Sequence, residues 1–281
     1  MSGSIKVSVI IPVYNGEKYI KECIDNLKKE TYPDIEIIAV DDGSSDATPE
    51  ILRVLQRDCP KLTVITQENG GAAAARNTGL DAATGDAVIF LDCDDKMQTD
   101  CIGALVDIMR SENADIVRFR LCYSYPDGTV RDGHAEFGAQ TATEKDGFFE
   151  NVYRPMLCGV RYNHIVRTLY KRSVIDGARF RTDLQTAEDL CFNIQAFTNA
   201  KRYVYTPDIR YYYYCSGTGL TGSALTARQK LECNIKAARA LKNALKEWGA
   251  DSTANRLRAD LRIVRITIAK IRRALFGGDA F

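Results

Sequence analysis

The stretch "AVIFLDCDD", residues 87–95, joins an apolar run to three carboxylates, those of Asp92, Asp94 and Asp95. A short run of this kind predicts a buried strand. Like charges that lie close together repel one another and are costly to bury unless something neutralises them. The cluster therefore has three possible uses: it binds a metal ion, it transfers a proton, or it forms a solvated turn.

Three earlier runs have the same form, an apolar stretch followed by polar residues. They are "VSVIIPVYN" (7–15), "IEIIAV" with "DDGSSD" (35–46) and "LTVIT" with "QENGG" (62–71). Helical patterns follow each of them, over 17–30, after Thr48 and Pro49, and over 72–83. This alternation predicts a largely parallel sheet flanked by helices. Because ligands bind beyond the carboxyl ends of such strands, we expect a site at that edge.

The second half of the chain has looser patterns. They predict helices over 101–110, near 146–156 and over 186–200, and strands over 114–125, 164–170 and 201–215. "PDGT" (126–129) is typical of a hairpin turn. From about Thr226 the chain is predicted to be helical to its end.

Composition excludes several classes of protein. A net charge of +1 gives no case for a nucleic-acid partner. No apolar run approaches the ~18 residues of a membrane-spanning helix, and residues 1–6 lack the apolar core of a signal peptide. Nine scattered cysteines, an odd number without a C-x-x-C pair, predict reduced thiols in a cytosolic compartment.

Two acidic motifs have a functional and a structural explanation each. Asp92 and Asp94 lie at a strand end, where both could face one cleft and supply oxygen ligands to Mg2+ or Mn2+; the alternative is a solvated loop. Glu188 and Asp189 open a predicted helix, where the helix dipole favours negative charge. They could equally supply a carboxylate base to the sheet edge.

The other motifs also leave alternatives open. "DDGSSD" could contact a nucleobase or ribose, or cap the following helix. Arg76 could hold a protein carboxylate or reach a base or phosphate. "YYYYCSGTGLTG" (211–222) could close over a phosphate-bearing ligand or form only a strand and loop. His134 and His164 lie far apart and near no catalytic pattern.

Taken together and in this order, the motifs resemble family 2 of the inverting, GT-A-fold glycosyltransferases, typified by enzymes of bacterial surface-polysaccharide assembly. The matching segments are residues 7–20, 35–48, 69–95 and 186–197, with a looser match at 164–175. The resemblance implies an α/β fold with a mostly parallel central sheet. It also implies a GT-A domain over 1–222, with a nucleotide-sugar half (about 1–120) and an acceptor half (about 121–222), followed by a helical extension over 223–281.

The resemblance also implies roles for individual residues. The expected nucleotide-sugar contacts are Pro12, Val13, Tyr14, Asn15, Asp41, Asp42, Arg76, Asp92, Cys93 and Ser216. Asp42, or else Asp41, resembles the acid that reads uracil. Asp94, with Asp92 near the ribose and sugar, would hold Mn2+ or Mg2+ on the diphosphate. Asp189 resembles the catalytic base, with Glu188 as a neighbour that orients it or contacts acceptor.

The implied reaction moves a sugar from a nucleotide sugar, expected to be UDP-linked, to a glycan or lipid-linked hydroxyl. One departure concerns the loop after the last strand, where many relatives carry a His or Arg; "CSGTGLTG" (215–222) has neither. A sugar-phosphate nucleotidyltransferase is a rival, but it should have a Gly-rich, basic loop after the first strand, and "PVYNGEKYI" (12–20) has a single glycine. A non-catalytic nucleotide-sugar-binding protein is the other alternative.

The C-terminal segment has its own pattern. Helical spacing relates Leu257, Leu261, Val264, Ile268, Ile271 and Leu275, with seven Lys and Arg among them and one acid, Asp260. Such a helix could lie on an anionic membrane surface, form a dimer seam, or dock on its own domain. The expected location is the cytoplasm, with the inner face of the cytoplasmic membrane as the place of any peripheral contact.

Overall fold

The structure is a computed structural model. It describes residues 3–276 apart from 134, 160–161, 163 and 216–224, with side chains described up to Ile266. The first half alternates strand and helix in the predicted order: β1 (Val7–Val13), α1 (Ile20–Leu27), β2 (Ile35–Asp41), α2 (Thr48–Asp58), β3 (Leu62–Thr66), α3 (Ala72–Ala82) and β4 (Ala87–Phe90). These strands lie in the order β3-β2-β1-β4, and each neighbouring pair is parallel. The parallel sheet predicted for this half is confirmed.

Close packing of α3 on β1 fixes the edge where the polar clusters meet. The apolar side chains of β1 are buried at consecutive positions because both faces of the sheet are covered. A Cβ added to Gly79 of α3 would lie 2.4 Å from Cγ2 of Ile10 in β1. Only glycine therefore allows this approach, which places Arg76, one turn earlier on α3, beside the strand ends.

The second half contains more elements than the sequence predicted. They are β5 (Lys96–Met97), α4 (Cys101–Ser111), β6 (Ile116–Ser124), β7 (Val130–Asp132), β8 (Thr141–Glu144), a 3-10 turn (Lys145–Gly147), a π-helical turn (Phe149–Tyr153), α5 (Arg154–Cys158), β9 (Thr168–Lys171), α6 (Arg172–Ile175), α7 (Glu188–Asn199), β10 (Arg202–Tyr214), α8 (Ala227–Glu247) and α9 (Thr253–Phe276). The predicted helices, the long strands and the hairpin turn are present. β5 and β8 had no sequence signal.

The sheet becomes mixed in this half. It continues in the order β4-β9-β6-β10-β5. β9 is antiparallel to both of its neighbours, whereas β10 runs parallel to β6. The strand predicted over 164–170 begins only at Thr168. The carbonyl of His164, before it, instead accepts from the Arg118 and Asn193 side chains.

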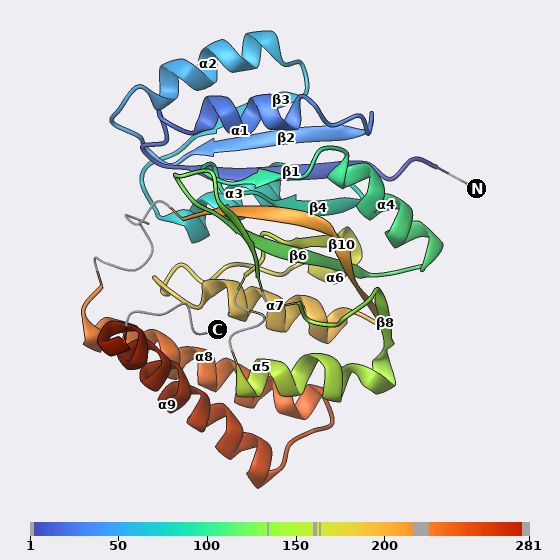
Figure 1. Cartoon of the computed structure of the whole chain (residues 1–281), viewed down its shortest axis with the longest axis vertical. Coiled ribbons are helices and arrows are strands. Elements are labelled where there is room, and N and C mark those ends of the chain that lie inside the picture. Colours follow the sequence, from blue (N-terminus) through green and yellow to red (C-terminus); the bar gives the residue numbers. More distant parts are fainter. Residues whose placement is uncertain (1–2, 134, 160–161, 163, 216–224, 277–281) are drawn as a thin grey trace.

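Figure 1 shows the sheet between two groups of helices, with α1 and α2 at the top and α5, α7, α8 and α9 at the bottom. The predicted division at residue 222 falls within 216–224, outside the described residues, and stays a prediction. Among the described residues, each helix is too short or too polar to span a bilayer.

A buried ionic cluster supports β6, β9 and β10. The Glu136 carboxylate accepts from Arg118 (Nη2, 2.9 Å), Arg167 (Nη2, 2.7 Å) and the Tyr203 hydroxyl. Burial raises the pKa of Glu136, but the two guanidinium groups outweigh burial and hold the pKa below its usual value. We call these four residues the Glu136 cluster. Arg118 also donates to the His164 carbonyl at 3.2 Å, so the cluster anchors the segment before β9.

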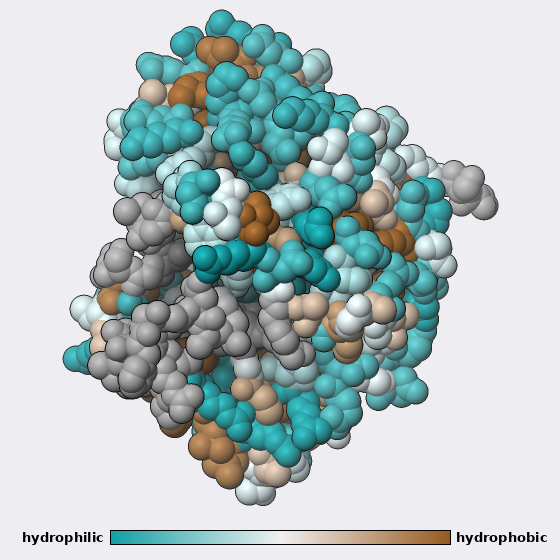
Figure 2. Space-filling model, viewed as in Figure 1, coloured by the Kyte–Doolittle hydropathy of each residue, from teal (hydrophilic) through white to brown (hydrophobic). Residues whose placement is uncertain are grey.

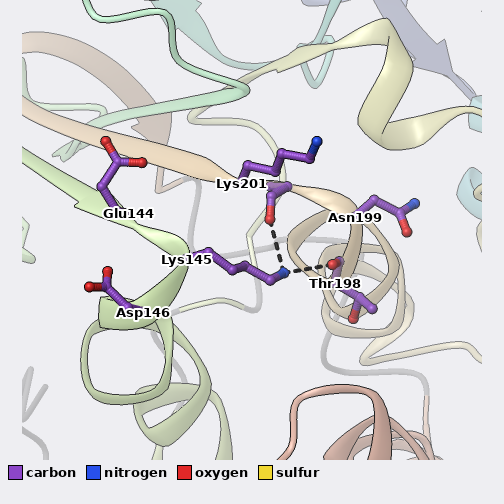
Figure 3. Close-up of a pocket in the computed structure, with 7 residues that line it drawn as sticks. Glu144, Lys145, Asp146, Thr198, Asn199 and Lys201 are labelled. Atoms are coloured by element: carbon purple, nitrogen blue, oxygen red, sulfur yellow. Dashed lines mark hydrogen bonds between the residues drawn. The ribbon is translucent and has the colours of Figure 1, made fainter.

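The C-terminal end of α7 is capped by a lysine. The ammonium group of Lys145 donates to the carbonyl oxygens of Thr198 (2.8 Å) and Ala200 (2.9 Å) and to the Tyr153 hydroxyl (3.0 Å). Figure 3 shows this cation beside a shallow depression of about 640 Å3. A cation at a helix C-terminus satisfies unpaired carbonyls and complements the helix dipole. The depression therefore marks a structural contact at the end of α7 remote from Glu188 and Asp189.

Candidate functional site

The loop after β1 is tied to the loop after β2. Asn15 has a left-handed backbone (φ 49°), which asparagine tolerates better than most residues. Its carboxamide oxygen accepts from the Ser45 N–H at 2.9 Å, and its own N–H donates to the Ser44 hydroxyl at 2.9 Å. Asn15 thus fixes two of the predicted nucleotide-contacting segments to each other.

The other predicted residues of this loop occupy different environments. Pro12 and Val13 end β1, where Val13 pairs in register with Asp41 of β2, and Tyr14 is exposed to solvent. Their predicted contact with a nucleobase stays a prediction.

Asp42 organises the loop that leads into α3. Its buried carboxylate accepts from Gln67 Nε2 (2.7 Å), the Gly70 N–H (2.9 Å) and the Gly71 N–H (2.8 Å). In the structure its partners are therefore protein donors, and its reading of uracil stays a prediction. Asp46, in the "DDGSSD" motif, lies just before α2 and accepts from the N–H of Thr48, the first residue of that helix. The N-cap position itself is Ala47.

Two buried polar atoms at this edge lack a hydrogen-bond partner among the described residues. They are Oδ2 of Asp41, whose Oδ1 accepts from the Ser44 N–H, and Nε of Arg76. Buried polar atoms are nearly always paired in folded proteins. These two exceptions both lie in segments that the sequence predicted to contact a nucleotide sugar.

Arg76 joins the acidic end of β4 to the start of α7. Its guanidinium lies 2.9 Å from Asp92, 3.4 Å from Asp189 and 3.7 Å from Glu188, and it lies over the Phe180 ring at 5.5 Å. Burial acts to lower the Arg76 pKa, but the three carboxylates outweigh burial and raise it. Of the two uses that the sequence left open for Arg76, the structure shows the contact with protein carboxylates. We call Arg76, Asp92, Glu188 and Asp189 the Arg76 cluster.

One cation faces three carboxylates in the Arg76 cluster, and the buried Asp189 has a strongly shifted pKa. Burial raises the Asp189 pKa to about 8; Arg76 opposes that shift, and Glu188 and Asp92 add to it. The Ile165 N–H donates to its carboxylate. A carboxylate with a pKa near neutral pH is suited to accept a proton during a reaction.

The backbone before Asp189 is strained. Ala187, the N-cap residue of α7, has a φ of 69°, a left-handed conformation that costs an L-residue about 1–2 kcal/mol. Phe180 and Phe192 stack at 4.2 Å and both meet Phe90 of β4 edge-on. This aromatic packing holds α7 against β4 and so holds Asp189 near the end of that strand.

The "DCDD" motif separates into different environments. Asp95 is buried and accepts from the Tyr211 hydroxyl (2.6 Å) and the Tyr214 N–H (2.7 Å), contacts that fix the loop to β10. Cys93 lies beside Gly16, whose added Cβ would be 3.3 Å from the Cys93 sulfur. Asp94 has no side chain paired with it among the described residues. Burial, and secondarily Asp92, raise its pKa to about 6.

These acids fit a partial metal site. In the described part of the chain, no three His, Cys, Asp or Glu side chains are grouped closely enough to enclose a metal ion. Mg2+ and Mn2+, however, often use only one or two carboxylates and complete their shell with phosphate and water. Asp94 provides such a carboxylate in a region with excess negative charge. The residues present therefore fit a cation that binds together with a diphosphate.

Sequence reasoning missed one side chain at this edge. The ring of His164 lies 6.5 Å from the ring of Tyr213. The charge of the Asp92 carboxylate acts to raise the pKa of His164. Burial, and secondarily Arg167 and Arg118, lower its pKa to about 4. No pattern in the sequence links His164 to Asp92. The link depends on the sheet order, in which β9, just after His164, lies beside β4, just before Asp92. Ser216, predicted to contact the donor, lies outside the described residues, as does His134.

The polar residues at the carboxyl edge from Asn15 to Asp95 lie within the range that a family profile matches. The profile described as "Glycosyl transferase family 2" matches residues 8–177. The chain belongs to this family. Among family 2 relatives, it is 34% identical over 200 residues to EpsJ of Bacillus subtilis, an uncharacterised glycosyltransferase, covering 70% of this chain and 57% of EpsJ. The chain thus spans little more than half the length of that relative.

Solved structures of glycosyltransferases share the fold. TarS of Staphylococcus aureus in complex with UDP-GlcNAc superposes with a TM-score of 0.73 at 22% identity, covering 96% of this chain and 73% of the TarS chain. The mannosyltransferase PcManGT of Pyrobaculum calidifontis, in complex with GDP-Man and Mn2+, gives a TM-score of 0.57 at 19% identity, covering 96% and 81%. The predicted GT-A fold is confirmed. The roles predicted for individual residues stay predictions.

Proposed function

We propose that the chain is a metal-dependent, inverting glycosyltransferase that transfers a sugar from a UDP-sugar to a hydroxyl of a glycan or lipid-linked acceptor. The observation that carries the proposal is the Arg76 cluster. A single guanidinium contacts both the acid at the end of β4 and the candidate base at the start of α7. The donor side and the base side of a transfer site would thus lie within one side chain's reach.

The donor would bind along the edge formed by the loops after β1, β2 and β4. The partnerless Asp41 Oδ2 and Arg76 Nε support a polar ligand there. The TarS structure, whose ligand is UDP-GlcNAc, supports UDP as the nucleotide. The Mn2+ of PcManGT supports a divalent cation. We assign Asp94 as the residue that holds Mn2+ or Mg2+, with Asp92 on the sugar side.

The chain's own residues would carry out the proton transfer. Asp189 accepts the proton of the acceptor hydroxyl as that oxygen attacks the anomeric carbon, and the bond to the nucleoside diphosphate breaks on the opposite face. A bound divalent cation would stabilise the charge that develops on the leaving diphosphate. One base and one displacement invert the anomeric centre, since retention by double displacement needs a second, nucleophilic carboxylate.

The decisive experiment combines a panel of UDP-sugars with Mn2+ and the Asp94→Asn variant. The wild type should release UDP from at least one donor in the presence of Mn2+, and Asp94→Asn should lose this release. Asp58→Asn, an exposed acid on α2, serves as the matched control and should retain it. Full activity of Asp94→Asn would refute the metal assignment. Binding of a UDP-sugar without UDP release would indicate a non-catalytic binding protein, and release of pyrophosphate from a sugar phosphate and UTP would indicate a nucleotidyltransferase.

A further inference from the structure

Over its described side chains, up to Ile266, helix α9 presents two opposite faces, and one of them packs on its own domain. Asn255, Ala259, Arg262 and Ile266 are buried, and α9 packs against α8 and α5. Nε of Arg262 donates to the carbonyls of Met156 (3.1 Å) and Gly159 (3.0 Å) at the end of α5. The predicted docking of this helix on its own domain is therefore present, and it uses this face.

The opposite face is apolar and exposed. Leu257, Leu261 and Val264 are 55%, 40% and 50% exposed. Because 3.6 residues make one turn, these three positions share a stripe roughly opposite the buried face. Figure 2 shows apolar surface among hydrophilic residues at the bottom of the molecule, where Figure 1 places this part of α9. Three large aliphatic side chains in one stripe on an outer helix form an apolar face without a partner in this chain's described part.

The charge of α9 selects among possible partners. Its 24 residues contain seven Lys and Arg and one acid, a net charge of +6. Since the whole chain carries +1, the remainder carries −5. Two copies of the chain meeting through this stripe would bring two strongly basic helices together, which costs free energy. A nucleic acid would neutralise the charge but would not cover the leucines.

We propose that the stripe formed by Leu257, Leu261 and Val264 binds an anionic lipid surface. The three side chains would enter the region below the head groups, while the basic residues of α9 other than the buried Arg262 stay at the level of lipid phosphates. The acidic remainder of the chain would be repelled from the same surface, and this repulsion would orient the molecule. Figure 1 shows the C-terminal end of α9 on the left, which is also the side on which β1 and β2 end. In this view the C-terminal end of α9 and the carboxyl edge of the sheet therefore lie on the same side of the molecule.

The test is co-sedimentation of the full chain with vesicles, which needs no catalytic activity. The chain should sediment with phosphatidylcholine vesicles that contain phosphatidylglycerol and not with phosphatidylcholine alone, and binding should weaken as salt rises. Replacing Leu257, Leu261 and Val264 together by glutamine should lower the partition coefficient by at least about tenfold. The circular dichroism spectrum should stay unchanged, because the buried face of α9 is intact.

The matched control replaces Val54 and Val130 by glutamine. These residues are 51% and 49% exposed but lie on α2 and β7, away from α9. The control should bind vesicles like the wild type. Equal loss in both variants, or no binding of the wild type to anionic vesicles, would overturn the proposal. A concentration-dependent dimer in analytical ultracentrifugation that only the triple variant loses would also overturn it and would assign the stripe to a second copy.

Discussion

The Arg76 cluster and the Glu136 cluster both join arginines to carboxylates, but they differ in charge balance and access. In the Arg76 cluster one cation meets three carboxylates, whose side chains are 30%, 17% and 16% exposed. In the Glu136 cluster two arginines meet one carboxylate, and the three charged side chains are at most 5% exposed. The first thus has excess negative charge that solvent or a ligand can reach, whereas the second is sealed.

This difference distinguishes a candidate functional site, the Arg76 cluster, from a structural one, the Glu136 cluster. Excess carboxylates near a strand end attract cations, and burial, with the neighbouring carboxylates adding to it, raises the pKa of an acid such as Asp189. A sealed cluster with every carboxylate oxygen paired can only hold segments together. His164 connects the two clusters. Its carbonyl accepts from Arg118 of the Glu136 cluster, and the carboxylate of Asp92, in the Arg76 cluster, acts to raise the pKa of its ring. The Glu136 cluster therefore contributes to the candidate site indirectly, by anchoring the segment beside it.

The largest expected effect comes from Asp189→Asn. Loss of the general base should reduce the transfer rate by about 10^3, while UDP-sugar binding is retained and the free energy of unfolding does not fall. Stability should persist because Arg76 keeps its 2.9 Å contact with Asp92. Transfer assays, calorimetry and urea denaturation measure the three quantities. Asp183→Asn, an exposed acid paired with Arg181 and Lys236, is the control that should keep the wild-type rate. A wild-type rate in Asp189→Asn would remove Asp189 as the base.

Glu136→Gln should show the opposite pattern, with stability as the main loss. Without the carboxylate, Arg118 and Arg167 would be buried next to each other uncompensated, which should cost about 3–5 kcal/mol in urea denaturation. Glu112→Gln is the matched control, since Glu112 pairs with Arg202 nearer the surface and should cost about 0–1 kcal/mol. Equal losses in the two variants would contradict the distinction between a sealed and an accessible cluster.

The pH dependence of stability should report the Arg76 cluster. The Asp189 pKa is about 8 in the folded chain against an ordinary value of 3.8, so the folded state binds its proton more tightly. This contribution to stability is complete below the ordinary pKa and is lost as pH rises through about 8. The free energy of unfolding of the ligand-free wild type should therefore fall more steeply over this window than that of Asp189→Asn. Parallel curves for the two proteins would show that the Asp189 pKa is unshifted.

The smallest effects are expected at Ala187. Glycine adopts the φ of 69° without strain but loses more conformational entropy on folding, so Ala187→Gly should stay within about 1 kcal/mol of the wild type and keep its activity. Ala187→Val should lower both stability and transfer rate, because a β-branched residue resists this conformation. Denaturation and initial rates check both variants. Equal behaviour of the two would show that the backbone before Asp189 is not constrained.

Much of the fold followed from local sequence patterns. Apolar runs and helical stripes predicted the strands and helices up to β4 because their side chains meet the core at fixed periods. The second half was predicted less completely. β5 has two residues and β8 four, too few to show a period. β9 begins after the start of the predicted strand, because the carbonyl of His164 accepts a hydrogen bond from the Arg118 side chain and not from the backbone of a neighbouring strand.

The sequence alone was enough to place the acidic and glycine-rich motifs at the carboxyl edge of a parallel sheet, since each motif directly follows a strand. What these motifs contact depends on tertiary packing. Arg76 and Asp189 are 113 positions apart and meet because α7 packs on β4 through Phe180 and Phe192. Periodicity describes each segment alone, whereas the balance of charge in a cluster depends on which distant segments the sheet order brings together. The same holds for α9, whose apolar spacing was plain in the sequence but whose exposed face was defined only by its packing on α5 and α8.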